Sequence, residues 1–230
     1  RWSSVARRYA LAGIWDPSTA HLPILGRAVD RAAARGDAVS LALADFWVGY
    51  HHYGLGHSAR AIAHCERALL TAQPLGNVRL QAQIRATLGQ ARWQACEHGP
   101  ALVLLDEAIG MVRADPDGTR ESMAAFAYSL ACRGWILADL GRFDEARELF
   151  EESLREVAGV EHPVYTWILS SYAVAALWQG RMEEAAAISA DTQRVSTRVR
   201  TFYMYAKTVA SEAYARWAMT GDADAALRLV

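Results

Sequence analysis

A short pattern recurs along this sequence: a glycine, a polar turn, and an alanine five residues after the glycine. Clear copies begin at Gly56, Gly141, Gly180 and Gly221, and a fifth, degenerate copy begins at Cys96. The alanines of the five copies stand at positions 61, 101, 146, 185 and 226, so the steps between them are 40, 45, 39 and 41 residues. A nearly constant period predicts a repeat architecture, in which each unit buries its apolar face against its neighbours.

Each part of the pattern has a physical role in a pair of helices. Glycine ends a helix readily because it adopts the left-handed backbone conformation that other residues resist. The small alanine lets two helices approach closely. Further glycines, Gly49, Gly89 and Gly134, stand twelve residues before three of the alanines. A glycine inside a helix costs about 1 kcal/mol relative to alanine, so we expect each of them to lie where two helices pack closely.

Apolar residues recur at helical spacing throughout the chain. Between residues 143 and 157 they fall on one face, while glutamates and arginines occupy the other. The sequence contains no strand pattern and no long linker. It therefore predicts an all-α fold, a right-handed α-solenoid of about six antiparallel helix pairs that forms a single domain over residues 1–230. The expected helices span about residues 2–14, 18–35, 38–54, 58–73, 77–97, 100–113, 120–140, 143–157, 163–179, 182–198, 201–220 and 223–230.

The composition narrows the range of partners. Hydrophobic residues make up 53% of the chain and the formal net charge is −1, so a packed core is expected and nucleic acid is not an expected partner. We expect no contact with a membrane, because no apolar run reaches about 18 residues. The three cysteines lie far apart in apolar helical contexts, which indicates buried, reduced thiols and a cytoplasmic protein. Arg1 and the helical pattern at Val230 suggest a fragment of a longer multidomain protein.

The residues around the third copy resemble a known family. The string from Leu140 to Ala146, with Gly134 before it and Phe150 after it, resembles the tetratricopeptide repeat signature. The usual period of that family is about 34 residues, so the period here is longer. Longer repeats of this kind resemble the C-terminal helical arrays of bacterial signalling proteins, such as LuxR/MalT-type ATPase activators and ATPase-linked nucleotide cyclases or kinases. The resemblance covers residues 38–230 and implies a regulatory array that senses an effector or a partner.

In arrays of this type the first helix of each pair lines a concave groove. Aromatic rings with a few amides suit the capture of a peptide or a small effector, because they bury a large area at a low cost in entropy. The alternative is that many of these side chains fill the interior between the helix layers. The candidate groove residues are Phe46, Tyr50, Tyr53, Gln83, Gln90, Trp93, Gln94, Tyr128, Trp135, Asp139, Trp167, Ser170, Val174 and Trp178.

Four histidines, His51, His52, His57 and His64, cluster near Cys65. Adjacent helical residues point about 100° apart, so His51 and His52 do not converge as the ligands of a zinc ion must. We therefore expect no metal site, and no cofactor. The glycines near His57 lack the lysine and the preceding strand of a phosphate-binding loop. No serine–histidine–aspartate or cysteine–histidine set supports catalysis.

These observations predict a protein-interaction and regulatory sensor module without enzymatic activity. It would bind a peptide, a partner domain or a small effector in an aromatic groove. A second hypothesis is self-association into a homo-oligomer, because residues 201–230 are apolar and aromatic and lack an obvious polar end cap. An enzyme is a third hypothesis, and no group of residues supports it.

Overall fold

The structure is a computed structural model that describes residues 18–114, 120–159, 162–199 and 202–230. The helix expected over residues 2–14 lies outside these ranges. Every regular element within them is helical, so the predicted all-α fold class is confirmed. The 3-10 helices are η1 (Thr19–His21) and η2 (Gln73–Leu75). The α-helices are α2 (Leu22–Ala34), α3 (Ala38–Gly54), α4 (Ser58–Ala72), α5 (Val78–Gln94), α6 (His98–Arg113), α7 (Arg120–Asp139), α8 (Phe143–Glu156), α9 (Pro163–Trp178), α10 (Met182–Val199), α11 (Phe202–Thr220) and α12 (Ala223–Leu227).

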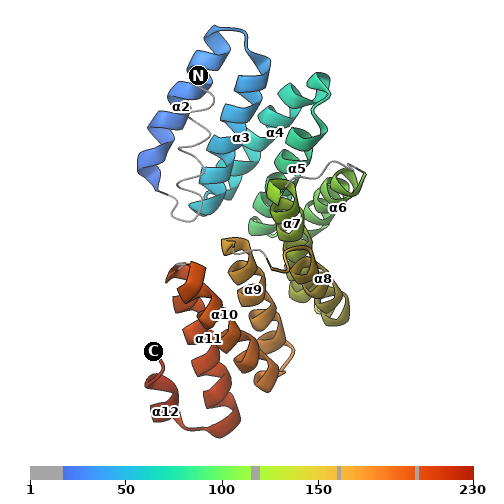
Figure 1. Ribbon diagram of the computed structural model, residues 1–230. Coiled ribbons are helices and arrows are strands. Elements are labelled where there is room, and N and C mark those ends of the chain that lie inside the picture. The colour runs from blue at the N-terminus through green and yellow to red at the C-terminus, as the bar shows by residue number, and fades with distance from the viewer. Residues whose placement is uncertain (1–17, 115–119, 160–161, 200–201) are drawn as a thin grey trace. The chain divides into compact units, whose positions relative to one another are not determined.

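The chain divides into two compact units, Arg1–Asp117 and Gly118–Val230. In the first unit α3 packs on α4 and α5 packs on α6; in the second unit α7 packs on α8 and α9 packs on α10 (Figure 1). First helices of successive pairs also touch each other: α3 contacts α5, and α9 contacts both α7 and α11. Each unit is therefore a stack of helical hairpins. The expectation of one continuous array over residues 1–230 stays a prediction.

The alanines of the repeat pattern lie at the helix contacts. Ala61, Ala101 and Ala185 are 0% exposed and Ala146 is 1% exposed, so the predicted burial is confirmed. The glycines twelve residues earlier explain why small residues are needed there. A Cβ atom at residue 89 would lie 3.1 Å from the Ala101 carbonyl oxygen, which is closer than about nine in ten real Cβ contacts. The repeat period therefore marks places where two helix backbones meet.

The glycines that open each copy end the preceding helix as predicted. Gly56, Gly141, Gly180 and Gly221 have φ values of 77°, 76°, 80° and 71°, in the left-handed region. At the α7–α8 turn the Gly141 N–H donates to Ala138 and the next N–H donates to Leu137, at 3.0 and 2.8 Å. These two bonds satisfy carbonyl groups at the end of α7. Each helix can therefore stop and reverse within a few residues.

Cysteine burial differs from the expectation at one position. Cys65 and Cys132 are buried, and burial raises the pKa of the Cys65 thiol to about 12. Cys96 is exposed, because it stands where the other copies have glycine and adopts the same left-handed conformation, with φ of 62°. The expected helix over residues 77–97 accordingly ends at Gln94. The prediction that all three thiols are buried is therefore wrong for Cys96.

Candidate functional site

The candidate positions on α3 form a run of aromatic rings. Tyr50 and Tyr53 are half-buried, with ring centroids 6.1 Å apart. The Gln94 side-chain amide of α5 donates to the Tyr53 carbonyl oxygen at 3.2 Å and so links the ends of the two first helices. Phe46 is only 4% exposed and packs on Trp47, with centroids 4.8 Å apart. Phe46 therefore belongs to the core and presents no surface to a ligand.

The candidate residues on α5 also differ in how far they are exposed to solvent. Gln83 and Gln94 are exposed and Trp93 is half-buried. Gln90 is only 2% exposed, and its Oε1 atom has no hydrogen-bond partner. Like Phe46, Gln90 is an interior residue. The candidate groove residues of the first unit that reach the surface are therefore Tyr50, Tyr53 and Trp93 with the amides of Gln83 and Gln94.

The second unit brings four predicted aromatic residues together. We call Tyr128 and Trp135 of α7 with Trp167 and Trp178 of α9 the α7–α9 aromatic cluster. Spacings of seven residues on α7 and eleven on α9 place each pair on one helix face. The ring centroids of Tyr128 and Trp167 are 4.4 Å apart, and those of Trp135 and Trp178 are 5.3 Å apart in an edge-on arrangement. Trp135 also lies 6.4 Å from Trp167, so the four rings form one connected group.

The cluster reaches the surface of its unit. Trp178 is 47% exposed, and the other three rings are half-buried. Asp139 is exposed and Val174 is half-buried. Ser170 is 0% exposed with a hydroxyl that lacks a hydrogen-bond partner, so it is an interior residue. The predicted positions thus include both a surface patch and part of the core.

Lys207 is a neighbour of the cluster that the sequence analysis missed. Its Nζ atom lies 4.7 Å from the centroid of the Trp135 ring, in a cation–π geometry. Burial lowers the pKa of Lys207 to about 8. A signal was present, since the chain has 24 basic residues and Lys207 is the only lysine among them. The lysine belongs to α11, so three successive first helices contribute to this region.

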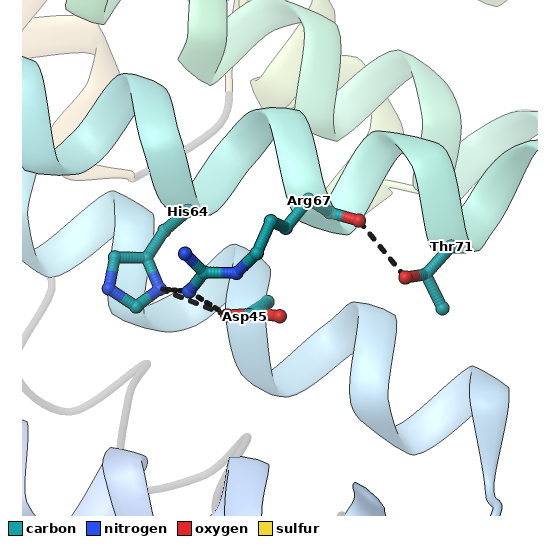
Figure 2. A network of polar contacts seen from close by, with 4 residues as sticks. All are labelled: Asp45, His64, Arg67 and Thr71. Atoms are coloured by element: carbon teal, nitrogen blue, oxygen red, sulfur yellow. Dashed lines mark hydrogen bonds and ion pairs between the residues drawn. The ribbon is translucent and has the colours of Figure 1, made fainter.

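A polar cluster joins α3 to α4 in the first unit (Figure 2). The Asp45 carboxylate is nearly buried, and its Oδ1 atom lies 2.9 Å from both His64 Nδ1 and Arg67 Nη2. Burial alone would raise the pKa of Asp45, but the hydrogen bonds from His64 and Arg67 outweigh it and hold that pKa below its usual value. The Thr71 hydroxyl donates to the Arg67 carbonyl oxygen at 3.0 Å. The arrangement holds the two helices of one pair together.

Two more histidines, His52 and His57, extend this cluster. His52 stacks on His64 with centroids 5.5 Å apart, and its Nδ1 atom lies 3.3 Å from that of His57. Burial and the neighbouring His64 and His57 lower the pKa of His52 to about 4, so this ring is neutral near pH 7. In the described ranges, no three or more histidine, cysteine or acidic residues are arranged to hold a metal ion. None of the described helices is long and apolar enough to cross a membrane.

Comparison with known proteins identifies the repeat. Residues 127–157 match the family model of the tetratricopeptide repeat. They include most of α7, the Gly141 turn and all of α8. No curated protein matches the chain in sequence. The matched segment holds the Gly134–Ala146 contact and two rings of the α7–α9 aromatic cluster.

Solved structures with a similar fold cover the rest of the chain. BtubC (BKLC) from P. vanneervenii is 15% identical, with a TM-score of 0.71 over 91% of this chain and 86% of that chain. The TPR-like repeats of a putative kinesin light chain from Podosopora anserina are 17% identical, with a TM-score of 0.57 over 86% and 94%. A Rap protein complexed with Competence and Sporulation Factor is 13% identical, with a TM-score of 0.61 over 100% and 64%. These likenesses and the family match show that the chain is built of TPR-like helical repeats.

Proposed function

We propose that these TPR-like repeats form a protein-interaction and regulatory sensor module that binds a peptide through the surface of its first helices. The observation that carries the proposal is the α7–α9 aromatic cluster, whose Trp178 is 47% exposed. Large aromatic side chains lose little entropy when they bind, and they dominate the energetics of protein interfaces. The cluster therefore offers an anchoring point for an apolar side chain of a partner.

The surface of the first unit belongs to the same proposal. Tyr50, Tyr53 and Trp93 combine half-buried rings with the exposed amides of Gln83 and Gln94. Amide groups can hydrogen-bond to the backbone of an extended peptide while the rings contact its side chains. Residues 1–230 would act as one array within a larger bacterial signalling or transcription-regulating protein of the cytoplasm. We propose no catalytic role.

The complex of a Rap protein with Competence and Sporulation Factor supports this form of binding. That protein has a similar fold to this chain. By analogy, the ligand here would be a regulatory factor, either a peptide or a small effector, and its binding would be signalled to the rest of the protein. The analogy concerns the fold alone, so the chemistry of the ligand must come from the residues of this chain.

The proposal is tested by selection of binding peptides. The full 230-residue chain would be immobilised and exposed to a displayed library of random dodecapeptides, and enriched sequences would be synthesised. Isothermal titration calorimetry should give a saturable 1:1 complex in the micromolar range, on the order of −8 kcal/mol. Selection that enriches no sequence above an unrelated helical protein contradicts the proposal.

A second candidate is self-association through α11 and α12. Tyr214 is 50% exposed and Trp217 is 46% exposed. Tyr214 stands twelve residues before Ala226, at the position that Gly134 occupies in its own repeat. The bulky ring in place of glycine leaves an aromatic face on α11 beside a short α12. Light scattering of the wild type and Trp217→Ala would detect a dimer that weakens in the variant, whereas a monomer at all concentrations contradicts this candidate.

A further inference from the structure

Several arginines of the second unit form ion pairs with carboxylates, but Lys207 does not. Among the residues that the structure describes, no acidic side chain forms an ion pair with its Nζ atom, which lies over the Trp135 ring. By contrast, Arg216 on the same helix pairs with Glu212, at 2.6 Å. Arg181 pairs with Glu184, at 2.5 Å. Lys207 is thus a half-buried cation over the Trp135 ring, without a counter-ion among the described residues.

Such a cation is costly in the free protein. Removal of an ammonium group from water is unfavourable unless an anion or several hydrogen-bond acceptors replace the water. The Trp135 ring offsets only part of that cost, since a cation–π contact contributes about 0.5–2 kcal/mol. The lowered pKa of Lys207 is the sign of this imbalance. A ligand that brings a negative charge to Lys207 would remove the imbalance and gain affinity from it.

The same lysine excludes cationic ligands. Clusters of tryptophan and tyrosine often bind cations, because the faces of their rings are electron-rich. Here the ammonium group of the chain already lies over Trp135, at 4.7 Å from the ring centroid. A second cation would be repelled at that distance. An anion next to an apolar group would instead meet Lys207 and the exposed Trp178 together.

We infer that the α7–α9 aromatic cluster and Lys207 form one binding site for an acidic peptide segment, in which a carboxylate pairs with Lys207 and a neighbouring aromatic side chain packs on Trp178. This inference rests on the proposed function and adds the chemistry of the ligand. The charge of Lys207 sets the preference for the carboxylate, and the rings supply most of the contact area. Binding would keep Lys207 protonated, so peptide affinity should fall as the pH rises above about 8.

A pair of matched probes tests the inference. The first is a set of N-acetylated, C-amidated dodecapeptides with a central Trp-Glu and randomised flanks, and the second set has Trp-Gln instead. The full chain should bind the best Glu peptide at least about tenfold more tightly than its Gln twin at low salt. Lys207→Met should abolish the difference, and Lys207→Arg should retain it, because arginine keeps the charge.

The single lysine allows a direct observation of the contact. Reductive methylation with 13C-formaldehyde gives one lysine signal besides that of the α-amino group, and its NMR shift reports the pKa of Lys207. The Glu peptide should raise that pKa by about 1–2 units, and the Gln peptide should leave it unchanged. Equal binding of both peptides with no effect of Lys207→Met overturns the inference and leaves the proposed function intact. If neither the Glu peptides nor the Gln peptides bind, and the dodecapeptide selection also enriches no sequence, both the inference and the proposed function are overturned.

Discussion

Gly134 of α7 lies against the backbone of Ala146 in α8, and a Cβ atom at residue 134 would lie 3.1 Å from the Ala146 carbonyl oxygen. The same relation links Gly89 to Ala101 and Gly49 to Ala61, at 3.1 and 3.3 Å. The repeat is therefore defined by contacts between helix backbones.

The first prediction concerns this contact. Gly134→Ala should destabilise the chain by about 1–3 kcal/mol, because the new methyl group must displace a backbone carbonyl, and Gly134→Leu should cost more. Gly110→Ala is the matched control: it is also helical, but nothing lies within 4 Å of its missing Cβ. That variant should gain up to about 1 kcal/mol from helix propensity. Urea denaturation measures both, and equal stability of the two variants would refute the close packing.

The sequence predicted the helices well because their signals are local. Gly56 and Gly141 mark helix ends by backbone conformation, and the helix expected over residues 38–54 has those bounds in the structure. Cys96 could also have been placed on the surface, because it aligns with these turn glycines. The residues beside it, Gln94, Glu97 and His98, are polar as well, so the expectation of burial had little local support.

The depth of the site residues was harder to predict. A first helix is covered by its own second helix and by neighbouring first helices, so it is apolar on most sides. On α9 the consecutive residues Leu169, Ser170 and Ser171 are all buried, and helical spacing alone does not separate core from surface there. Lys207 was missed for another reason. Its contact with Trp135 joins residues more than 70 positions apart, and no local pattern reports such a distance.

Cys96→Gly should stabilise the protein by about 0.5–1 kcal/mol. Cys96 adopts φ of 62°, which costs a residue with a Cβ atom about 1–2 kcal/mol, and the greater freedom of glycine in the unfolded chain cancels part of the gain. The reciprocal change, Gly56→Ala, should destabilise by about 1 kcal/mol because Gly56 has φ of 77°. Thermal denaturation of both variants under reducing conditions checks the pair. A less stable Cys96→Gly variant would contradict this prediction and show that the Cys96 side chain itself stabilises the folded protein.

Asp45→Asn should destabilise the first unit by about 1–3 kcal/mol, because it removes the charge that His64 and Arg67 share. The pKa of Asp45 is lowered in the folded state, so its contribution is present above the pKa of the unfolded chain and is lost as the pH falls through the folded pKa. The difference between wild type and variant should therefore shrink below about pH 4. Denaturation at several pH values tests this, and a difference that stays constant down to pH 2 would contradict it.

Lys207→Met should stabilise the free protein at pH 7 by about 1–2 kcal/mol, because it replaces a poorly solvated charge with an apolar chain of similar length. The folded pKa of Lys207 is about 8 and its ordinary value is 10.5. The gain should be complete below pH 8 and should decline between pH 8 and about pH 10.5, where the folded protein loses this proton before the unfolded chain does. Stability curves at pH 7 and pH 10 check the sign, and a destabilised variant at pH 7 would mean that Lys207 is well accommodated without a ligand.

The central claim is that the α7–α9 aromatic cluster is a binding surface, and two tryptophans of equal exposure test it most directly. Trp178 is 47% exposed and Trp217 is 46% exposed, but only Trp178 belongs to the cluster. The measurement is the affinity of a selected peptide for the wild type, Trp178→Ala and Trp217→Ala by calorimetry. We predict a loss of at least about 30-fold for Trp178→Ala, as for an aromatic anchor, and less than about threefold for Trp217→Ala. Equal affinity of the two variants would contradict the account.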